Sequence, residues 1–305
     1  MSSKTELIRS ESPTLVPPRG KVKPGPRFAN RQEMQPWLVW TLRLASAILF
    51  FGLWEWASRT KVLDPFFFPA PSQILGTLGN EFTKLRGKPA PADFGEALGR
   101  IPQAKIWGDI WETLAETMLG FLIGTGLGLG LGFLFGRVKP VSTVYMPLMV
   151  LLNALPRIAL GPLFLIWFGI GFNKSVALSV SIVLFIVFFN VYSGLKEVDQ
   201  SLINNARILG ANEAGLIRHV LFPSAVGWIF NSLRISVSFA LVGAVLGEYL
   251  AAQRGIGFQI ATAASLFEAD GVFANLIILV VIVLILDAIL QLIERRFSTW
   301  KQTIR

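Results

Sequence analysis

The stretch KEVDQSLINNARILGANEAGLIRHVLFP, Lys196 to Pro223, is a polar and charged segment between two long apolar spans. It predicts two short helices that meet at Gly210, because Asp199 can cap the first helix and Asn212 the second. Gly210 suits the C-terminal turn of the first helix, and Pro223 is expected to close the second. The pattern predicts a helical hairpin at a membrane face.

Four apolar residues of the first helix recur at three- and four-residue steps and therefore share one face. They are Leu202, Ile203, Ala206 and Leu209. An apolar stripe is stabilised when it is buried, and a hairpin outside the bilayer can bury it against another protein. We therefore expect a protein partner at this hairpin.

The composition places the chain in a lipid bilayer. Hydrophobic residues make up 53% of the 305 positions, charged residues 15%, and the mean hydropathy is +0.58. The net charge of +9 lies in tails and in short turns between apolar runs, which favours a role in membrane topology over nucleic-acid binding. The absence of cysteine excludes disulfides, and the single His219 argues against a histidine metal centre.

Six apolar segments are long enough to cross a bilayer. They are Trp37–Ala57, Ile110–Phe135, Val144–Phe168, Ser175–Tyr192, Val226–Leu250 and Val272–Ile293. Residues 1–36 carry seven Lys or Arg and several prolines, so we expect a disordered basic tail that stays in the cytoplasm. Six spans then place both termini and the hairpin on the cytoplasmic side.

The chain is expected to divide into four parts. These are the basic tail 1–36, the first span with an extracytoplasmic connector 37–108, a core of five helices 109–296 that includes the hairpin 196–223, and a cytoplasmic tail 297–305. Prolines interrupt the connector and leave room for one short amphipathic helix near Ser72–Leu85.

The second span carries glycines at intervals of four. The row consists of Gly120, Gly124, Gly128, Gly132 and Gly136, and Gly126 and Gly130 lie on a neighbouring row. A smooth glycine ridge lets helix backbones approach closely in lipid, where apolar side chains gain little from leaving other apolar groups. We expect the row to pack against protein. The packing surface lies within one subunit, or it takes part directly in motion or in contact between two copies.

The third span is interrupted by Asn153, Pro156, Arg157 and Pro162. A proline removes a backbone hydrogen bond and bends a helix, and an arginine at membrane depth is costly unless it is paired or hydrated. We interpret Asn153, Pro156 and Arg157 as candidate residues of a translocation path. A structural kink with an arginine that pairs with backbone carbonyls is the alternative.

Three further charged residues lie within spans. Arg234 and Asp287 fall at similar depth in the fifth and sixth spans, so we predict that they pair or share water and brace these helices. Glu248, near the outer end of the fifth span, is a second candidate for the path or its external gate. A hydrogen bond at a helix end is the alternative for Glu248.

No nucleotide site is found in the sequence. GIGFNKS, Gly169–Ser175, lacks the ending and the spacing of a phosphate loop, and no GxxxxGK[ST] occurs elsewhere. No nucleophile, base and orienting group recur in one plausible pocket either, which argues against an enzyme. A transporter driven by an ion gradient and a membrane scaffold or sensor remain possible classes.

The hairpin resembles the cytoplasmic loop of binding-protein-dependent ABC importer permeases, whose pattern is E-A-A, three residues, Gly, nine residues, I-x-L-P. Ala206, Gly210 and Pro223 match that pattern, with Val220 and Phe222 in the last tetrad, whereas Asn204 and Asn205 replace its leading E-A. FFFPAPSQIL, LFLIWFGIG and LGEYLAAQRGIGFQI resemble other segments of the family, so the likeness runs from about Phe66 to Trp300. It is greatest to permeases of the nitrate, sulfonate and taurine type.

The resemblance implies an all-α integral membrane protein with six transmembrane helices and the MetI-like permease fold of type I importers, in a bacterial inner membrane. It implies coupling to an ABC ATPase through the hairpin, and the candidate coupling residues are Leu202, Ala206, Arg207, Leu209, Gly210 and Pro223. The expected partners are two ATPase copies that bind ATP and Mg²⁺, an external solute-binding protein, and a second copy of the permease. The expected cargo is a small anion such as nitrate, a sulfonate or taurine, with a thiamine precursor or riboflavin as alternatives.

Overall fold

The structure is a computed structural model that describes residues 35–84 and 94–298, and within these ranges every regular element is a helix. Nearly all of the predicted N-terminal tail and most of the C-terminal tail lie outside the described residues. The chain divides into two units, one up to Phe50 and one from Phe51 onward. The first described helix, α1 (Pro36–Arg59), contributes to both.

Five described helices are long and apolar enough to cross a membrane. They are α1, α4 (Lys105–Arg137), α7 (Phe172–Lys196), the continuous helix Glu213–Ala251 that contains α10 (Phe222–Ala251), and α12 (Ala269–Ser298). A sixth candidate is a bent pair, α5 (Lys139–Ala154) and α6 (Gly161–Phe168), which a 3₁₀ turn at Arg157–Leu160 joins at 88°. The predicted third span is therefore a broken helix.

The glycine row of α4 lies against α7. A Cβ added at Gly124 would come within 2.7 Å of the Val183 Cβ, and one at Gly128 within 2.7 Å of the Val187 Cβ. The same step of four continues from Gly132 to Val191 and from Gly136 to Leu195, whereas Gly126 and Gly130 have nothing within 4 Å of an added Cβ. Because residue numbers rise together on both helices, α4 and α7 run parallel.

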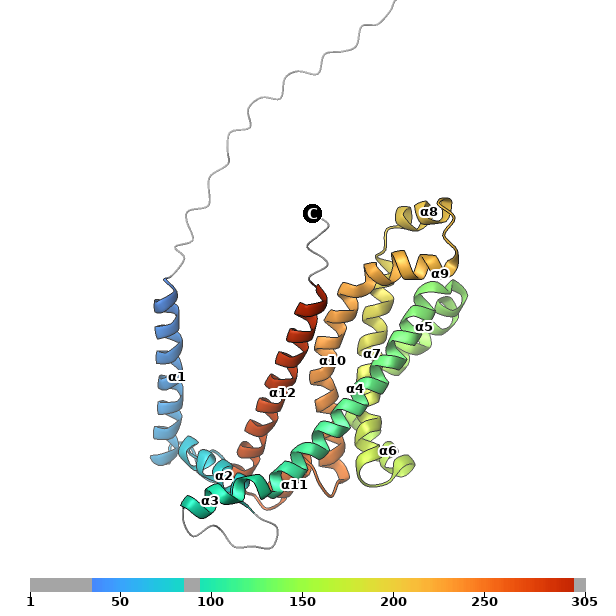
Figure 1. The fold of residues 1–305 in the computed structure, drawn as a ribbon. Coiled ribbons are helices and arrows are strands. Elements are labelled where there is room, and N and C mark those ends of the chain that lie inside the picture. The colour runs from blue at the N-terminus through green and yellow to red at the C-terminus, as the bar shows by residue number, and fades with distance from the viewer. Residues whose placement is uncertain (1–34, 85–93, 299–305) are drawn as a thin grey trace, which may run out of the picture. The chain divides into compact units, whose positions relative to one another are not determined.

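This parallel pairing bears on the number of crossings. A chain that leaves the end of α4 and begins a parallel α7 must first return across the bundle. The α5–α6 pair is the segment that makes this return (Figure 1). Counted as one crossing, the bent pair brings the candidate membrane spans among the described residues to six.

Small residues also bring α10 close to α7, which lies between α4 and α10. Gly243 packs on Ser179 so closely that an added Cβ would lie 2.5 Å from the Ser179 Cα, and Gly247 packs in the same way on Ser175. The Ser179 hydroxyl donates to the Ala240 carbonyl at 3.0 Å. Residue numbers here run in opposite directions, so α7 and α10 are antiparallel.

The short helices gather at the two ends of the second unit. α2 (Pro71–Thr83), α3 (Phe94–Arg100) and α11 (Ile256–Ser265) lie at the end where α4 and α12 begin, and α8 (Gln200–Ile208) and α9 (Glu213–Leu216) lie at the opposite end (Figure 1). α4 begins at Lys105, directly after a 3₁₀ turn at Ile101–Gln103, so the predicted core boundary at residue 109 falls inside a helix.

Candidate functional site

The α8–α9 hairpin, residues 199–221, has the local geometry that its sequence predicts. The Asp199 Oδ1 accepts from the Ser201 backbone N–H at 2.8 Å, and the Asn212 Oδ1 accepts from the Gly215 N–H at 2.7 Å. Gly210 has φ +84°, the left-handed conformation in which glycine avoids the strain of a side chain. The Ser201 N–H and hydroxyl stabilise the carboxylate of Asp199 and hold its pKa below the usual range. Side-chain caps at both helices therefore define the hairpin.

Pro223 does not close the second helix of the hairpin, contrary to the prediction. The chain continues as helix from Glu213 to Ala251, with a π-helical turn at Ile217–Leu221 immediately before Pro223. A proline inside an α-helix lacks an N–H and crowds the carbonyl one turn earlier, and a wider π turn relieves that crowding. The hairpin is thus covalently and helically continuous with a membrane-spanning helix.

The predicted apolar stripe of α8 is divided between two surfaces. Ile203 and Ala206 pack against the hydrophobic core of the bundle. The aliphatic side chains of Leu202, Ile208 and Leu209 remain 51%, 82% and 86% exposed. We call these three residues the aliphatic knob. Only Leu202 and Leu209 of the predicted stripe therefore stay exposed, together with Ile208 from outside the stripe.

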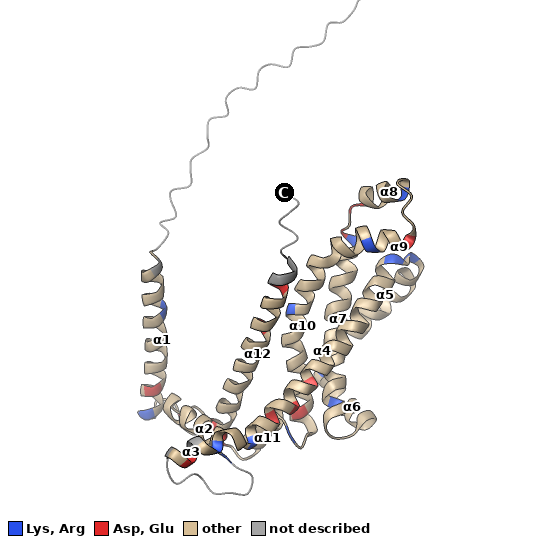
Figure 2. Cartoon of the chain, viewed as in Figure 1, with Lys and Arg blue, Asp and Glu red and all other residues tan. Residues whose placement is uncertain are grey.

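One ion pair attaches the hairpin to the end of α4, and a second joins the two helices of the hairpin. The Arg137 guanidinium donates to Glu213 at 2.8 Å, and Arg207 reaches the other oxygen of Glu213 at 3.5 Å. Both pairs are solvent-exposed, so each contributes at most about 1 kcal/mol. Figure 2 shows Lys and Arg gathered at this end of the bundle, around α9 and the start of α5. The contacts fix the place of the hairpin beside the α4–α5 turn.

At the α5–α6 bend the structure shows a carbonyl-paired arginine. Arg157 donates to the Leu152 and Asn153 carbonyls, each at 3.2 Å, and to the Asn153 side-chain oxygen at 2.9 Å. Its guanidinium also lies 4.6 Å from the ring centroid of Phe185. These hydrogen bonds are the ones expected if the segment is a structural kink with an arginine that pairs with backbone carbonyls. Asn153 and Pro156 are exposed on the described protomer. Their place on a translocation path stays a prediction.

Glu248 is fully buried and holds the start of α11. Its Oε1 accepts from the Thr113 hydroxyl at 2.6 Å and its Oε2 from the Gly257 N–H at 2.6 Å. The Thr113 oxygen also accepts from the Ile256 N–H at 2.9 Å. The helix-end hydrogen bond expected as the alternative is therefore present, and a role of Glu248 on the path or its gate stays a prediction.

Asp109 completes the arrangement around α11. Its oxygens accept from the Gly255 N–H at 3.2 Å and from the Gln259 side-chain nitrogen at 2.6 Å. Asp109, Thr113 and Glu248, which we call the polar clasp, thus satisfy the free N–H groups at the N-terminus of α11. Negative charge is favoured there by the helix dipole. The clasp joins α4, α10 and α11.

A buried lysine lies next to the clasp and was not predicted. Lys174 is 0% exposed and donates to the Ala251 carbonyl at the end of α10. It also interacts electrostatically with Glu116 and Glu248, which are 1% and 0% exposed. A sequence signal for Glu116 existed, because Asp109, Thr113 and Glu116 precede the glycine row on the same face of α4. No comparable periodicity marks Lys174.

Arg234 pairs with a different acid from the one predicted. Its guanidinium donates to Glu294, and Asp287 instead accepts from the Gln291 side chain at 2.7 Å on its own helix. Glu294 lies two turns beyond Asp287 toward the end of α12. A long arginine side chain gains hydration by reaching toward that end, which favours the outer partner.

Comparison with known proteins gives one family. The family described as "Binding-protein-dependent transport system inner membrane component" matches residues 124–299. The taurine transport system permease protein TauC of Escherichia coli (strain K12) is 27% identical over 260 residues, covering 85% of this chain and 90% of that protein.

Two further relatives match shorter regions. The aliphatic sulfonates transport permease protein SsuC of Bacillus subtilis (strain 168) is 30% identical over 157 residues, covering 52% of this chain and 57% of that protein. The riboflavin transport system permease protein RibX of Chloroflexus aurantiacus is 32% identical over 155 residues, covering 51% of this chain and 58% of that protein.

A solved structure shares the fold. An inward-facing conformation of the MetNI methionine ABC transporter contains a chain that superposes with a TM-score of 0.56 at 21% identity. The match covers 63% of this chain and 95% of that one.

Proposed function

Because the chain belongs to the family of binding-protein-dependent transport system inner membrane components, and so is a multi-pass permease of an ABC importer, we propose how it is driven and what it carries. The α8–α9 hairpin receives an ATPase subunit, which binds and hydrolyses the ATP. The transported solute is a small sulfonate-like anion that an external binding protein delivers. The importer works in a bacterial inner membrane.

The aliphatic knob is the observation that carries the ATPase assignment. Three large aliphatic side chains stand exposed on a polar hairpin at one end of the bundle. An exposed apolar group of this kind is typical of a protein interface. The knob lies on the hairpin whose sequence matches the family's cytoplasmic loop at Ala206 and Gly210. An ATPase that binds there would act directly on the helix Glu213–Ala251.

Charge supports a cytoplasmic place for the hairpin. Arg137, Lys139 and Lys196 flank spans at the hairpin end, and Arg207 and Arg218 lie on the hairpin itself. Cytoplasmic segments of membrane proteins carry an excess of Lys and Arg. The described end of α12 lies at the hairpin end as well (Figure 1). The basic composition of residues 1–36 favours the same side for the N-terminus, so both termini are cytoplasmic.

A second copy of the permease completes the assembly. One chain presents one hairpin, so two copies are needed to engage two ATPase subunits. Large apolar side chains of the bent pair, including Leu151, Ile166 and Trp167, are 64%, 79% and 62% exposed. Lipid covers part of that surface, and the second copy covers the rest.

The cargo assignment rests on the extent of the likeness. The taurine permease matches along 90% of its own length, whereas the riboflavin permease matches along 58%. An aliphatic sulfonate permease is also among the relatives. A small anion with a sulfonate group is therefore the first candidate, and riboflavin or a thiamine precursor is the second.

One reconstitution tests the coupling. The permease is assembled in nanodiscs with its ATPase, and binding of the ATPase is measured for the wild type and for Leu209→Asp. A buried aspartate at the knob would lose apolar contact and remain unpaired, so ATPase affinity should fall at least tenfold. Val62→Asp is the matched control, because Val62 is 67% exposed on a turn at the opposite end. Equal ATPase binding by both variants would exclude the knob as the contact.

A second experiment tests the cargo and the energy source. The external binding protein is screened against taurine, alkanesulfonates, nitrate, riboflavin and a thiamine precursor by thermal shift, and the best ligand is followed into proteoliposomes. Uptake should require ATP inside and the loaded binding protein outside. Uptake driven by an ion gradient in the absence of ATP would instead favour a secondary transporter.

A further inference from the structure

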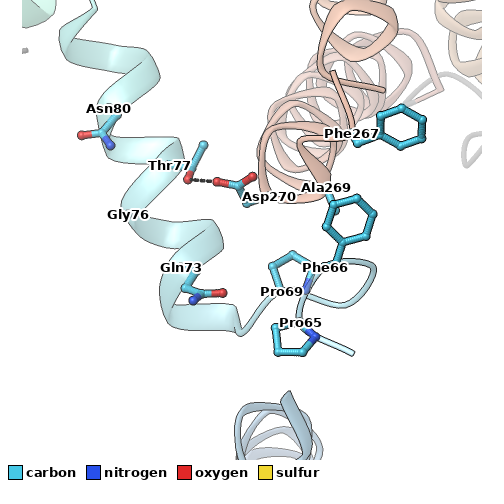
Figure 3. Close-up of a pocket in the computed structure, with 10 residues that line it drawn as sticks. All are labelled: Pro65, Phe66, Pro69, Gln73, Gly76, Thr77, Asn80, Phe267, Ala269 and Asp270. Atoms are coloured by element: carbon cyan, nitrogen blue, oxygen red, sulfur yellow. Dashed lines mark hydrogen bonds between the residues drawn. The ribbon is translucent and has the colours of Figure 1, made fainter. Parts of the chain in front are cut away.

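A pocket of about 520 Å³ opens at the end of the bundle opposite the hairpin. We call it the outer pocket. It lies between α2, the loop before α2, and the turn that joins α11 to α12 (Figure 3). Its lining residues include Phe66, Gln73, Thr77, Asn80, Phe267 and Asp270.

The polar wall of the outer pocket contains a carboxylate that can accept further hydrogen bonds. Gln73, Thr77 and Asn80 follow one another at helical spacing along α2 and line the pocket together. The Thr77 hydroxyl donates to the Asp270 Oδ2 at 2.6 Å and fixes this carboxylate (Figure 3). Among the described residues, no hydrogen bond or ion pair involves the Asp270 Oδ1. Asp270 can therefore accept from a further donor.

The apolar wall includes two aromatic rings, beside Pro65, Pro69 and Ala269. Phe66 and Phe267 stack with centroids 6.2 Å apart, although their residues are 53% and 70% exposed. Phe267 also has φ +59°, a left-handed backbone that costs a bulky residue free energy. The left-handed backbone belongs to the turn that ends α11, where the Glu268 N–H donates to the Ala263 carbonyl at 2.9 Å, but this turn does not require a large exposed ring. The cost is offset if a partner covers the ring.

The two walls together are suited to a cation. A carboxylate attracts an ammonium or guanidinium group, and aromatic faces add a cation–π attraction. The amide groups of Gln73 and Asn80 can accept further N–H bonds. Phe67 and Leu266, each next in sequence to one of the two rings, are also exposed, at 61% each. A charged anchor enclosed by an apolar ring is typical of an energetic hot spot in a protein interface.

We propose that the outer pocket receives a lysine or arginine side chain of the external solute-binding protein. The choice of partner rests on the proposed function, which places a binding protein at this end of the permease. Asp270 pairs with the basic group, and Phe66 and Phe267 cover the aliphatic stem. The permease thereby recognises its delivering protein through one polar anchor.

The test compares two acids that are close in sequence. Asp270→Asn removes the charge, yet its amide oxygen can still accept from Thr77, so the fold is retained. Glu268→Gln removes the same charge from an exposed residue outside the outer pocket and serves as the control. Affinity of the binding protein for the permease–ATPase complex in nanodiscs is measured by interferometry at low and high salt. Melting temperatures of all variants report on folding.

We expect D270N to weaken binding of the binding protein about tenfold and to reduce the salt dependence, because a charge pair is lost. E268Q should change the affinity less than about twofold, as expected for a solvated charge. F267A should weaken binding without changing the salt dependence. Equal affinities for D270N and E268Q, at unchanged melting temperatures, would overturn the proposal.

A cross-link identifies the occupant directly. The chain contains no cysteine, so F267C provides a single thiol for a photoactivated cross-linker. Mass spectrometry should find the adduct on the binding protein, beside a lysine or arginine. Adducts only on lipid or on a second permease copy would refute the assignment. If the wild-type complex shows no response to any binding protein, the proposed function itself fails, which is a separate result.

Discussion

A pair of glycine substitutions on one helix tests the packing of α4 against α7. Gly128→Ala adds a Cβ that would lie 2.7 Å from the Leu184 carbonyl oxygen and 2.7 Å from the Val187 Cβ. Gly130→Ala, two residues further along, adds a Cβ with nothing within 4 Å. Both variants gain the same helix propensity, so the difference between them isolates the packing of α4 on α7.

The magnitude follows from the two contributions. Replacing glycine by alanine in a helix gains about 0.5–1 kcal/mol, whereas overpacking a tight contact costs about 1–3 kcal/mol. A rotamer change cannot relieve the contact at Gly128, because one of the atoms met is a backbone oxygen of α7. We therefore expect G128A to lose about 1–2 kcal/mol of unfolding free energy and G130A to be neutral or slightly stabilising.

The measurement is a denaturant titration in mixed micelles, with helix content as the signal. It is repeated for G124A, which meets Val183, and for G126A, which meets open space. Agreement of G128A with G130A to within about 0.5 kcal/mol, the usual error of additivity, would refute the close approach of α4 and α7. Loss of stability in all four variants would place a second packing surface on the Gly126 row.

Three other outcomes are expected. Thr113→Val should destabilise the fold by about 2–4 kcal/mol, because it leaves two buried partners unpaired, and Thr113→Ser should restore most of the loss in the same titration. Asp199→Ala should speed amide exchange across α8, whereas Asp199→Asn should not, because asparagine can still cap the helix. The pKa of Asp199 is lowered in the fold, so the stabilising effect of its carboxylate is present at neutral pH and is lost as the pH falls below the usual aspartate range. A double-mutant cycle between Arg234 and Glu294 should give a coupling of at most about 1 kcal/mol, and a cycle between Arg234 and Asp287 should give none.

Local sequence patterns predicted the structural features that depend only on neighbouring residues of the same helix. The all-α membrane fold of an importer permease is confirmed. The caps at Asp199 and Asn212 and the left-handed Gly210 also occur where the sequence predicts them, because each depends on hydrogen bonds or backbone angles within a few residues. Signals of this kind are present in any short window of the sequence.

Long-range contacts were beyond such patterns. Asp109 meets Gly255 across 146 positions and Thr113 meets Glu248 across 135, so no periodicity connects them. The helix that faces Arg234 carries two acids, Asp287 and Glu294. Arg234 pairs with Glu294, which lies closer to the end of that helix. The Pro223 prediction was wrong because a π turn, which has no strong sequence signal, lets the helix continue.

The continuous helix from Glu213 to Ala251 connects the hairpin at one end of the bundle to the polar clasp at the other end. Glu213 to Ala251 is 39 residues long, which at about 1.5 Å per residue is a contour length of about 58 Å, and the helix changes direction between α9 and α10 (Figure 1). One end of this helix belongs to the hairpin that carries the aliphatic knob. The other end carries Glu248 of the polar clasp, which holds α11. Because α10 packs closely on α7 and no loop separates it from the hairpin, a displacement of the hairpin is expected to reach the clasp through this helix.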